Sequence, residues 1–196
     1  HERNTCPYCN RNYIFVVNKE GNKLRPEIDH FFPKSIYPFL AISFYNLIPS
    51  CLPCNHVKKD KDSFSDNLIS PYEINFYDFK FTCRLVNINF SLIGKYNENR
   101  FKIVLNKNRN VIKNDEYFKL ELLYEQHKDI VADLLLKKLI YPISYIKELK
   151  KNFAFTDDEI YRFLFCNYLK DEDLHKKPLS KFIKDISEDI GLLKII

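Results

Sequence analysis

Cys6-Pro-Tyr-Cys9 and Cys51-Leu-Pro-Cys54 are the two stretches that decide how this chain folds. Two thiolates separated by two residues can bind one Zn²⁺ from a single tight turn, and two such pairs complete a closed tetrahedral site. The gap between the pairs is longer than in many zinc ribbons, so it holds an inserted element. Two disulfides or four buried thiols are the alternatives, but the paired spacing favours zinc. Because a closed site leaves no position for water, this zinc is expected to fold the module.

Polar residues suited to phosphodiester cleavage lie between the cysteine pairs and directly after them. Asp29 and His30 are neighbours, Asn46 follows, and Asn55 and His56 come straight after the second pair. Hydrolysis of a phosphodiester needs a base for water, a cation on the phosphate and help for the leaving oxygen. Histidine exchanges protons near pH 7, which suits His30 as the base. Asp29 offers a hard oxygen ligand for Mg²⁺ or Mn²⁺.

The Asp29-His30 pair can serve one site only under a condition on the backbone. Adjacent residues of a regular strand face opposite sides, so the strand must end or bend here, and Pro33 soon afterwards makes this plausible. An isolated Asp-His pair would be interpreted as a surface pair. Asn46 and Asn55 within the same stretch favour a site instead.

These residues resemble a family. The matching stretches are Asp29-His30-x-x-Pro33, Asn46-Leu47-Ile48 and Cys51-x-x-Cys54-Asn55-x-x-Lys58. The pattern, over about residues 6–61, is similar to that of the HNH endonucleases, whose ββα-metal motif runs His, Asn and then His or Asn. The resemblance implies that His30 is the general base and that Asp29 and Asn55 hold one divalent cation. It also implies that Asn46 braces the loop and orients His30. The family's zinc knuckle falls on Cys6, Cys9, Cys51 and Cys54.

The third position of the motif has two candidates, Asn55 and His56. The form Cys-x-x-Cys-Asn-x-x-Lys favours Asn55, and on a helix only one of two neighbours points directly at a metal. His56 would then contact phosphate or have no role.

The lysines after the second pair also have two interpretations. Lys58, Lys59 and Lys61 could contact the nucleic-acid backbone beside the scissile phosphate, with Lys58 as an auxiliary site residue. Asp60 and Asp62 interleave with them, so a plain solvated helix face is an equal alternative.

A narrower resemblance rests on further stretches, namely Phe32-Pro-Lys-Ser-x-Tyr37-Pro-Phe-Leu40, Ser43-Phe-Tyr-Asn-Leu-Ile-Pro-Ser-Cys51, Ile69-Ser-Pro-Tyr72 and, more weakly, Tyr124-Glu-x-His127 and Lys177-Pro-Leu-Ser-Lys181. They look like the HNH subunits of Septu-type anti-phage systems, the PtuB family, and similar subunits occur with some retrons. This resemblance implies an ABC-type ATPase partner of the PtuA kind, which would restrain or license the nuclease. The chain has three Gly and no Gly-rich phosphate loop, so it is not itself the ATPase.

The overall composition bears on the kind of partner and on the cellular location. The 196 residues are 45% hydrophobic and carry a net charge of +5, which permits a nucleic-acid partner without requiring one. No stretch approaches the ~20 apolar residues of a membrane span, so no membrane partner is expected. Six cysteines in a long, Gly-poor chain favour intracellular thiols and a cytoplasmic location. Cys83 and Cys166 lie in apolar surroundings and are expected to be buried thiols.

We therefore predict an α+β protein. A zinc-stapled ββα-metal HNH module is expected over residues 1–75, a β-rich extension over 76–112 and a partner-docking helical region over 113–196. Turn residues at 20–23 predict a hairpin, and a polar helix is expected from Asn55 to about Asp66. Pro142 should separate two helices, and Thr156-Asp-Asp-Glu159 has the form of a capping box.

The predicted function is a metal-dependent HNH endonuclease, with DNA favoured as substrate. The same residues could cleave RNA such as tRNA, and a binding module without turnover is the rival from another class. Many aromatic residues crowd one span: Phe31, Phe32, Tyr37, Phe39, Phe44 and Tyr45. Core packing explains most of them, and base stacking suits one or two, but the sequence does not select which.

Overall fold

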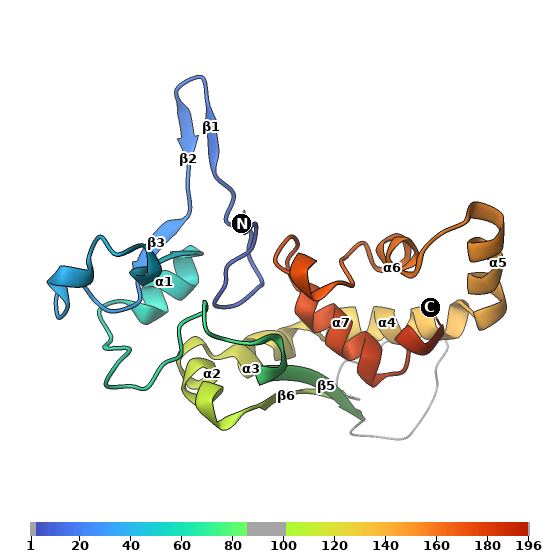
Figure 1. Ribbon diagram of the computed structural model, residues 1–196. Helices are drawn as coiled ribbons and strands as arrows, with labels where there is room; N and C mark the ends of the chain where they lie inside the picture. Colours follow the sequence, from blue (N-terminus) through green and yellow to red (C-terminus); the bar gives the residue numbers. More distant parts are fainter. Residues whose placement is uncertain (1–2, 86–100, 196) are drawn as a thin grey trace. The chain divides into compact units, whose positions relative to one another are not determined.

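The computed structural model describes residues 3–85 and 101–195 (Figure 1). It has helices and short antiparallel strand pairs, so the prediction of a mixed α+β chain is confirmed. The chain divides into two compact units. The first comprises His1–Phe79, Lys107–Leu120 and Leu174–Leu179, and the second comprises Lys80–Asn106, Glu121–Asp173 and Ser180–Ile196. Each unit combines distant segments, whereas the three predicted segments are continuous in the chain.

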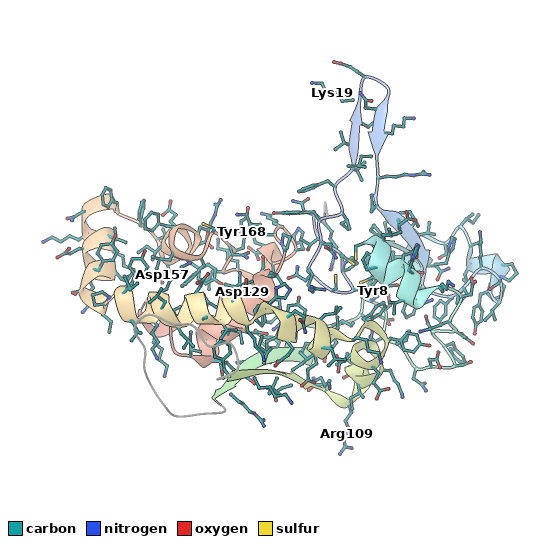
Figure 2. All side chains as sticks on the ribbon, turned by 180° about the vertical axis from the view of Figure 1, so that it is seen from behind. Tyr8, Lys19, Arg109, Asp129, Asp157 and Tyr168 are labelled. Atoms are coloured by element: carbon teal, nitrogen blue, oxygen red, sulfur yellow. The ribbon has the colours of Figure 1, made fainter. Side chains whose placement is uncertain are left out.

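The first unit begins with a β-hairpin. Strands β1 (Val17–Lys19) and β2 (Asn22–Leu24) pair antiparallel, and Val17 lies opposite Leu24. Glu20 and Gly21 join them with φ angles of 49° and 84°, the two positive values that a type I′ turn requires. The predicted hairpin turn is confirmed. Every residue of both strands is exposed, and Figure 2 shows Lys19 at the tip.

Two strands and a helix follow in the order ββα. Strand β3 (Glu27–His30) pairs antiparallel with β4 (Leu47–Ser50), so that Asp29 lies opposite Ile48 and His30 opposite Leu47. Helix α1 (Leu52–Lys58) comes directly after β4 and packs against β3. Two single turns of 3-10 helix, η1 (Pro38–Leu40) and η2 (Phe44–Asn46), lie between the strands.

Helix α1 differs from the predicted helix at both ends. It begins at Leu52 because Pro53 fits the first turn, where a missing N–H breaks no helical hydrogen bond. It ends at Lys58 because Lys59 has a φ of 47°. The carboxylate of Asp62 then accepts a hydrogen bond from the backbone N–H of Phe64 at 3.1 Å, which favours a turn over further helix.

Two later segments complete the first unit. Helix α2 (Ile112–Phe118) packs against α1, and the Asn114 side chain donates to the carbonyl of Ile69 and accepts from its N–H at 2.7 and 3.1 Å. The short segment Leu174–Leu179 is hydrogen-bonded to the N-terminal turn, where Thr5 donates to the His175 carbonyl at 2.8 Å. Also within this unit, η3 (Phe76–Asp78) lies between α1 and Phe79, and η5 (Arg109–Val111) precedes α2.

The second unit packs helices against a strand pair. Strands β5 (Phe79–Leu85) and β6 (Phe101–Lys107) form a two-stranded sheet. Residues 86–100, in the middle of the β-rich extension predicted over 76–112, fall outside the described residues. Phe81, Tyr124 and Phe182 form an aromatic centre with ring centroids 4.2–5.3 Å apart.

The helices of this unit include the predicted break at Pro142 and the predicted cap at Thr156. They are α3 (Leu120–Tyr124), α4 (Lys128–Ile140), α5 (Ile143–Phe153), α6 (Asp157–Phe165) and α7 (Ser180–Asp189), with 3-10 turns η6 (Glu125–His127), η7 (Asp171–Asp173) and η8 (Leu193–Ile195). The interruption at Pro142 is confirmed, and Thr156 and Glu159 form the predicted capping box. Helix α6 ends at Phe165, and the next residue, Cys166, has a left-handed φ of 51°. Cys166 is exposed and Cys83 is half-buried, so their predicted burial is wrong.

None of the helices within residues 3–85 and 101–195 is long and apolar enough to cross a membrane.

Candidate functional site

The four cysteines of the two pairs form one buried cluster. Their sulfur atoms all lie within 4.8 Å of one another, and the Sγ atoms of Cys9 and Cys51 are 3.9 Å apart. A disulfide would hold two sulfurs at about 2.05 Å, and none of the six cysteines, all of which the structure describes, forms one. Tetrahedral zinc with bonds of about 2.3 Å separates its sulfur ligands by about 3.8 Å. The cluster therefore has the ligand type, number and spacing that a zinc ion needs.

Hydrogen bonds to the sulfurs also favour a metal site. The backbone N–H of Arg11 donates to the sulfur of Cys9, and Asn12 Nδ2 donates to that of Cys51, both at 3.4 Å. Such outer partners stabilise thiolates and orient them. Asn12 was missed by the sequence reasoning, although its place in the turn after the first pair is a usable signal.

The cluster joins two distant parts of the first unit. Cys6 and Cys9 lie in a turn that is closed by hydrogen bonds from Asn10 N to the Cys6 carbonyl (2.7 Å) and from Cys6 N to the Asn12 carbonyl (2.9 Å). Cys51 precedes α1, and Cys54 lies in its first turn. A metal bound by all four thiols would fix the N-terminal turn to the junction of β4 and α1.

His30 is the last residue of β3 and is half-buried. Its Nε2 atom lies 3.1 Å from the carbonyl oxygen of Ala41. A carbonyl can only accept, so Nε2 is the ring nitrogen that carries the proton. In the neutral ring, Nδ1 then holds the lone pair. The fold thus assigns the two nitrogens different roles, and Nδ1 is the one that can take a proton.

Asn46 holds together the loop between β3 and β4. Its buried side chain accepts from the N–H of Phe32 at 2.6 Å and donates to the carbonyls of Phe32 and Leu40 at 3.0 and 3.1 Å. Leu40 directly precedes Ala41, the acceptor for His30. Both the start of the loop and the segment that orients His30 therefore depend on one amide side chain.

Asp29 lies on the buried side of β3 and meets Tyr8. The Tyr8 hydroxyl donates to Asp29 Oδ2 at 2.5 Å, and the Tyr8 ring stacks on Phe118 with centroids 4.4 Å apart. Burial raises the pKa of the Asp29 carboxyl, while the Tyr8 hydrogen bond and the charge of Lys58 oppose the shift. Burial and the adjacent carboxylate raise the pKa of Tyr8 well above its ordinary value. A carboxylate has about four lone-pair positions, and the bond to Tyr8 uses one of them.

Lys58 is completely buried. Its ammonium donates to the carbonyls of His30 and Lys61 at 3.3 and 3.1 Å, and burial lowers its pKa. This position suits a structural bridge between α1 and the end of β3. The interpretation of Lys58 as a phosphate contact is therefore replaced, because its charged end is used inside the unit. Lys59 and Lys61 are exposed.

Asn55 and His56 occupy neighbouring positions of α1 with different surroundings. Asn55 is half-buried and His56 is exposed, as expected when successive side chains on a helix point about 100° apart. In the described part of the chain, no three His, Cys, Asp or Glu side chains other than the four cysteines lie close enough to share an ion. Asp29, His30 and His56 therefore do not form such a group.

Comparison with known proteins adds one relative. Over 68 residues the chain is 37% identical to the Septu protein PtuB of Bacillus thuringiensis. Part of this chain is homologous to PtuB. The matched stretch is 35% of this chain and 24% of the relative, so the chain spans about a quarter of that protein's length. No family model matches the chain. No solved structure matches it either.

Proposed function

We propose that this chain is a metal-dependent HNH endonuclease that hydrolyses phosphodiester bonds in nucleic acid, with DNA favoured. The observation that carries the proposal is the geometry of His30, which ends β3 with Nε2 on the Ala41 carbonyl and Nδ1 left to accept a proton. The ββα order of β3, β4 and α1 beside a four-cysteine cluster supports it. The partial homology to PtuB supports a role in anti-phage defence.

Zinc is the proposed structural ion. The four buried thiols suit a closed site, and Cys6, Cys9, Cys51 and Cys54 would all be occupied as ligands. Binding energy from such a site is folding energy, because the unfolded chain has no preformed cluster. The zinc would keep Tyr8, which lies between two of the ligands, against Asp29.

The catalytic cation would be held elsewhere, by Asp29 and Asn55. Their carboxylate and amide oxygens are ligands that Mg²⁺ or Mn²⁺ accepts. When bound, such a cation supplies positive charge to the scissile phosphate and the leaving 3′ oxygen. His56 is the weaker candidate for this position, because its side chain is exposed whereas that of Asn55 is half-buried.

Side chains of this protein would accept the proton and hold His30 in position. Nδ1 of His30 would take the proton of the attacking water, while the Nε2 bond to Ala41 keeps the ring oriented. Asn46 would hold the acceptor segment in place through Leu40. Lys58 would fix the backbone of His30 through its carbonyl. His30 is thus the proposed catalytic residue, and Asn46 and Lys58 are positioning residues.

The proposed partner is an ABC-type ATPase of the PtuA kind, with the helical region over residues 113–196 as its docking part. The homology to a Septu protein supports a defence complex. An alternative is cleavage of RNA, such as tRNA, by the same residues. A zinc-stabilised binding module without turnover is the second alternative.

Cleavage assays test this proposal. The purified chain, alone and with the ATPase partner, is incubated with plasmid DNA and with total tRNA in Mg²⁺ or Mn²⁺. Wild type should cut at least one substrate, and His30→Ala should not. His175→Ala, which removes a histidine outside the proposed site, is the matched control and should cut like wild type. Equal cutting by wild type and His30→Ala, or no cutting under any condition, would contradict the nuclease proposal.

A further inference from the structure

The loop between β3 and β4 exposes large apolar side chains to solvent. Phe39, Ile42, Phe44 and Tyr45 are between 75% and 93% exposed, whereas Phe31 at the start of the same loop is buried. Four such residues within seven positions are far from the usual scatter of single exposed hydrophobics, and such patches mark binding sites. The fold therefore separates the aromatic residues that build the core from those available to a ligand.

The exposed rings are supported by contacts with neighbouring aromatic rings. The hydroxyl of Tyr37 donates to Asp62 at 3.1 Å, and the Tyr37 ring makes an edge contact with Phe39 at 6.2 Å. Phe44 and Tyr45 pack edge to face on each other, with centroids 5.7 Å apart. Because the rings are supported in this way, less conformational entropy would be lost when a ligand binds them.

The loop also carries the hydrogen-bond acceptor of the proposed base. His30 donates to the carbonyl of Ala41, which follows Phe39 by two residues and precedes Phe44 by three. The exposed rings thus lie on both sides, along the chain, of the residue whose carbonyl binds His30. The same loop segment is fixed through the bond from Asn46 to Leu40.

The charge of the loop is compatible with a polyanionic ligand. Residues 31–46 include Lys34 and contain no Asp or Glu, although the whole chain has 26 acidic residues. The loop itself thus presents no carboxylate to a nucleic-acid strand, and the Asp62 carboxylate at its side accepts the hydrogen bond from Tyr37. Exposed aromatic rings suit unpaired bases in particular, because every base has a π-face and stacking tolerates any sequence.

We propose that Phe39, Phe44 and Tyr45 form a stacking surface for unpaired bases that flank the scissile phosphate. The substrate class of the site is then single-stranded or locally unpaired nucleic acid, and intact duplex is a poor substrate. This inference rests on the proposed nuclease function, since it assigns the substrate of the same site. Single-stranded DNA and single-stranded RNA share the recognised chemistry.

Binding is tested without cleavage in the His30→Ala background. The probes are a fluorescein-labelled 20-nucleotide DNA strand, the RNA strand of the same sequence and the DNA duplex, each titrated and followed by anisotropy. The parent should bind a single strand more tightly than duplex. Phe44→Ala and Tyr45→Ala should each weaken single-strand binding about 5- to 100-fold. Phe44→Trp should retain it, and Phe44→Leu should not, because stacking needs an aromatic face.

A matched control is Phe163→Ala, which removes a comparably exposed ring from α6 and should leave all affinities unchanged. Circular dichroism and zinc content check that each variant is folded. Unchanged single-strand affinity in Phe44→Ala and Tyr45→Ala would overturn the inference and favour a protein partner on this surface. Full affinity in Phe44→Leu would overturn it too, because any apolar side chain would then serve.

The two proposals can fail separately. If wild type cuts duplex and single strands equally and the alanine variants cut like wild type, the stacking surface is wrong and the nuclease stands. If wild type binds single strands through these rings but cuts nothing, the nuclease is wrong and the stacking surface stands as a binding site.

Discussion

The hydroxyl of Tyr8 donates a hydrogen bond to the carboxylate of Asp29 at 2.5 Å. Tyr8 lies between Cys6 and Cys9, so the turn that carries two of the cluster cysteines also contacts the strand that ends at His30. The cysteine cluster and the candidate catalytic strand are therefore mechanically linked through one phenol. This link gives the cluster a second consequence beyond folding, since any change in the turn changes the surroundings of Asp29.

Replacement of Tyr8 by Phe should lower the free energy of unfolding by about 1–3 kcal/mol, because a buried acceptor loses its donor. The ring stacking on Phe118 would be retained. Urea unfolding followed by circular dichroism measures the change. Tyr13→Phe is the control, since Tyr13 is exposed, and it should change stability by less than about 0.5 kcal/mol. A Tyr8→Phe protein as stable as wild type would show that this hydrogen bond contributes no net free energy to folding.

Metal analysis should find about one zinc per chain. Cys51→Ser should lose the zinc and unfold the first unit, since structural sites contribute folding energy outright. Cys166→Ser, at an exposed position, should keep the zinc and the fold. Plasma emission spectrometry and a thermal melt measure both properties. A folded, zinc-free wild-type protein would contradict the proposed metal site.

Replacement of Asp29 by Asn should abolish cleavage yet leave the protein as stable as wild type or more stable at pH 7. The folded-state pKa of Asp29 is raised by burial, so the carboxyl stabilises the fold fully below the unfolded pKa. That contribution is lost as the pH rises through the folded pKa. Asn does not ionise, so the stability difference in favour of Asp29→Asn should grow as the pH rises from about 4 towards 7.

Urea unfolding across this pH range, without added divalent cation, measures the effect. The exposed Asp60→Asn should show no comparable trend. If Asp29→Asn were destabilising at pH 7 and the loss grew with pH, the carboxylate would be acting as a structural anion. It would then be a poor candidate for a cation ligand.

The second unit contains an ion pair between buried Asp185 and half-buried Lys181, and its removal should be destabilising. Lys181 donates to both carboxylate oxygens of Asp185 at 2.7 and 2.6 Å, and Phe81 N–H donates to the same carboxylate at 3.0 Å. Asp185→Ala should lower the free energy of unfolding by about 2–4 kcal/mol, because the half-buried Lys181 ammonium and the Phe81 N–H both lose this carboxylate. Chemical denaturation measures the loss.

Glu188→Ala is the matched control for this pair. It removes an exposed partner of Lys80, 2.9 Å away, and should cost at most about 1 kcal/mol. If both substitutions lowered the free energy of unfolding equally, burial would not be the reason why the Asp185 pair stabilises the fold.

Short-range patterns in the sequence predicted much of the fold. The Cys-x-x-Cys spacing indicated the four-sulfur cluster, because thiolates two residues apart suit one ion. Glu20-Gly21 indicated the hairpin turn, and Thr156 with Glu159 indicated the cap of α6. Each of these depends on residues close together in the chain or on one repeated ligand motif. The ends of helices were harder to predict, because positive φ values at Lys59 and Cys166 leave no clear compositional signal.

The order of His30, Asn46 and Asn55 along the chain suggested a candidate site from sequence alone, because this chemistry requires particular residue types. Contacts between distant residues were decided only by the tertiary structure. It brought the Ala41 carbonyl to Nε2 of His30, buried Lys58 against carbonyls, and left Phe44 exposed. The physical reason is that a residue type limits what a side chain can donate, accept or bury, while packing decides which partner or solvent it meets.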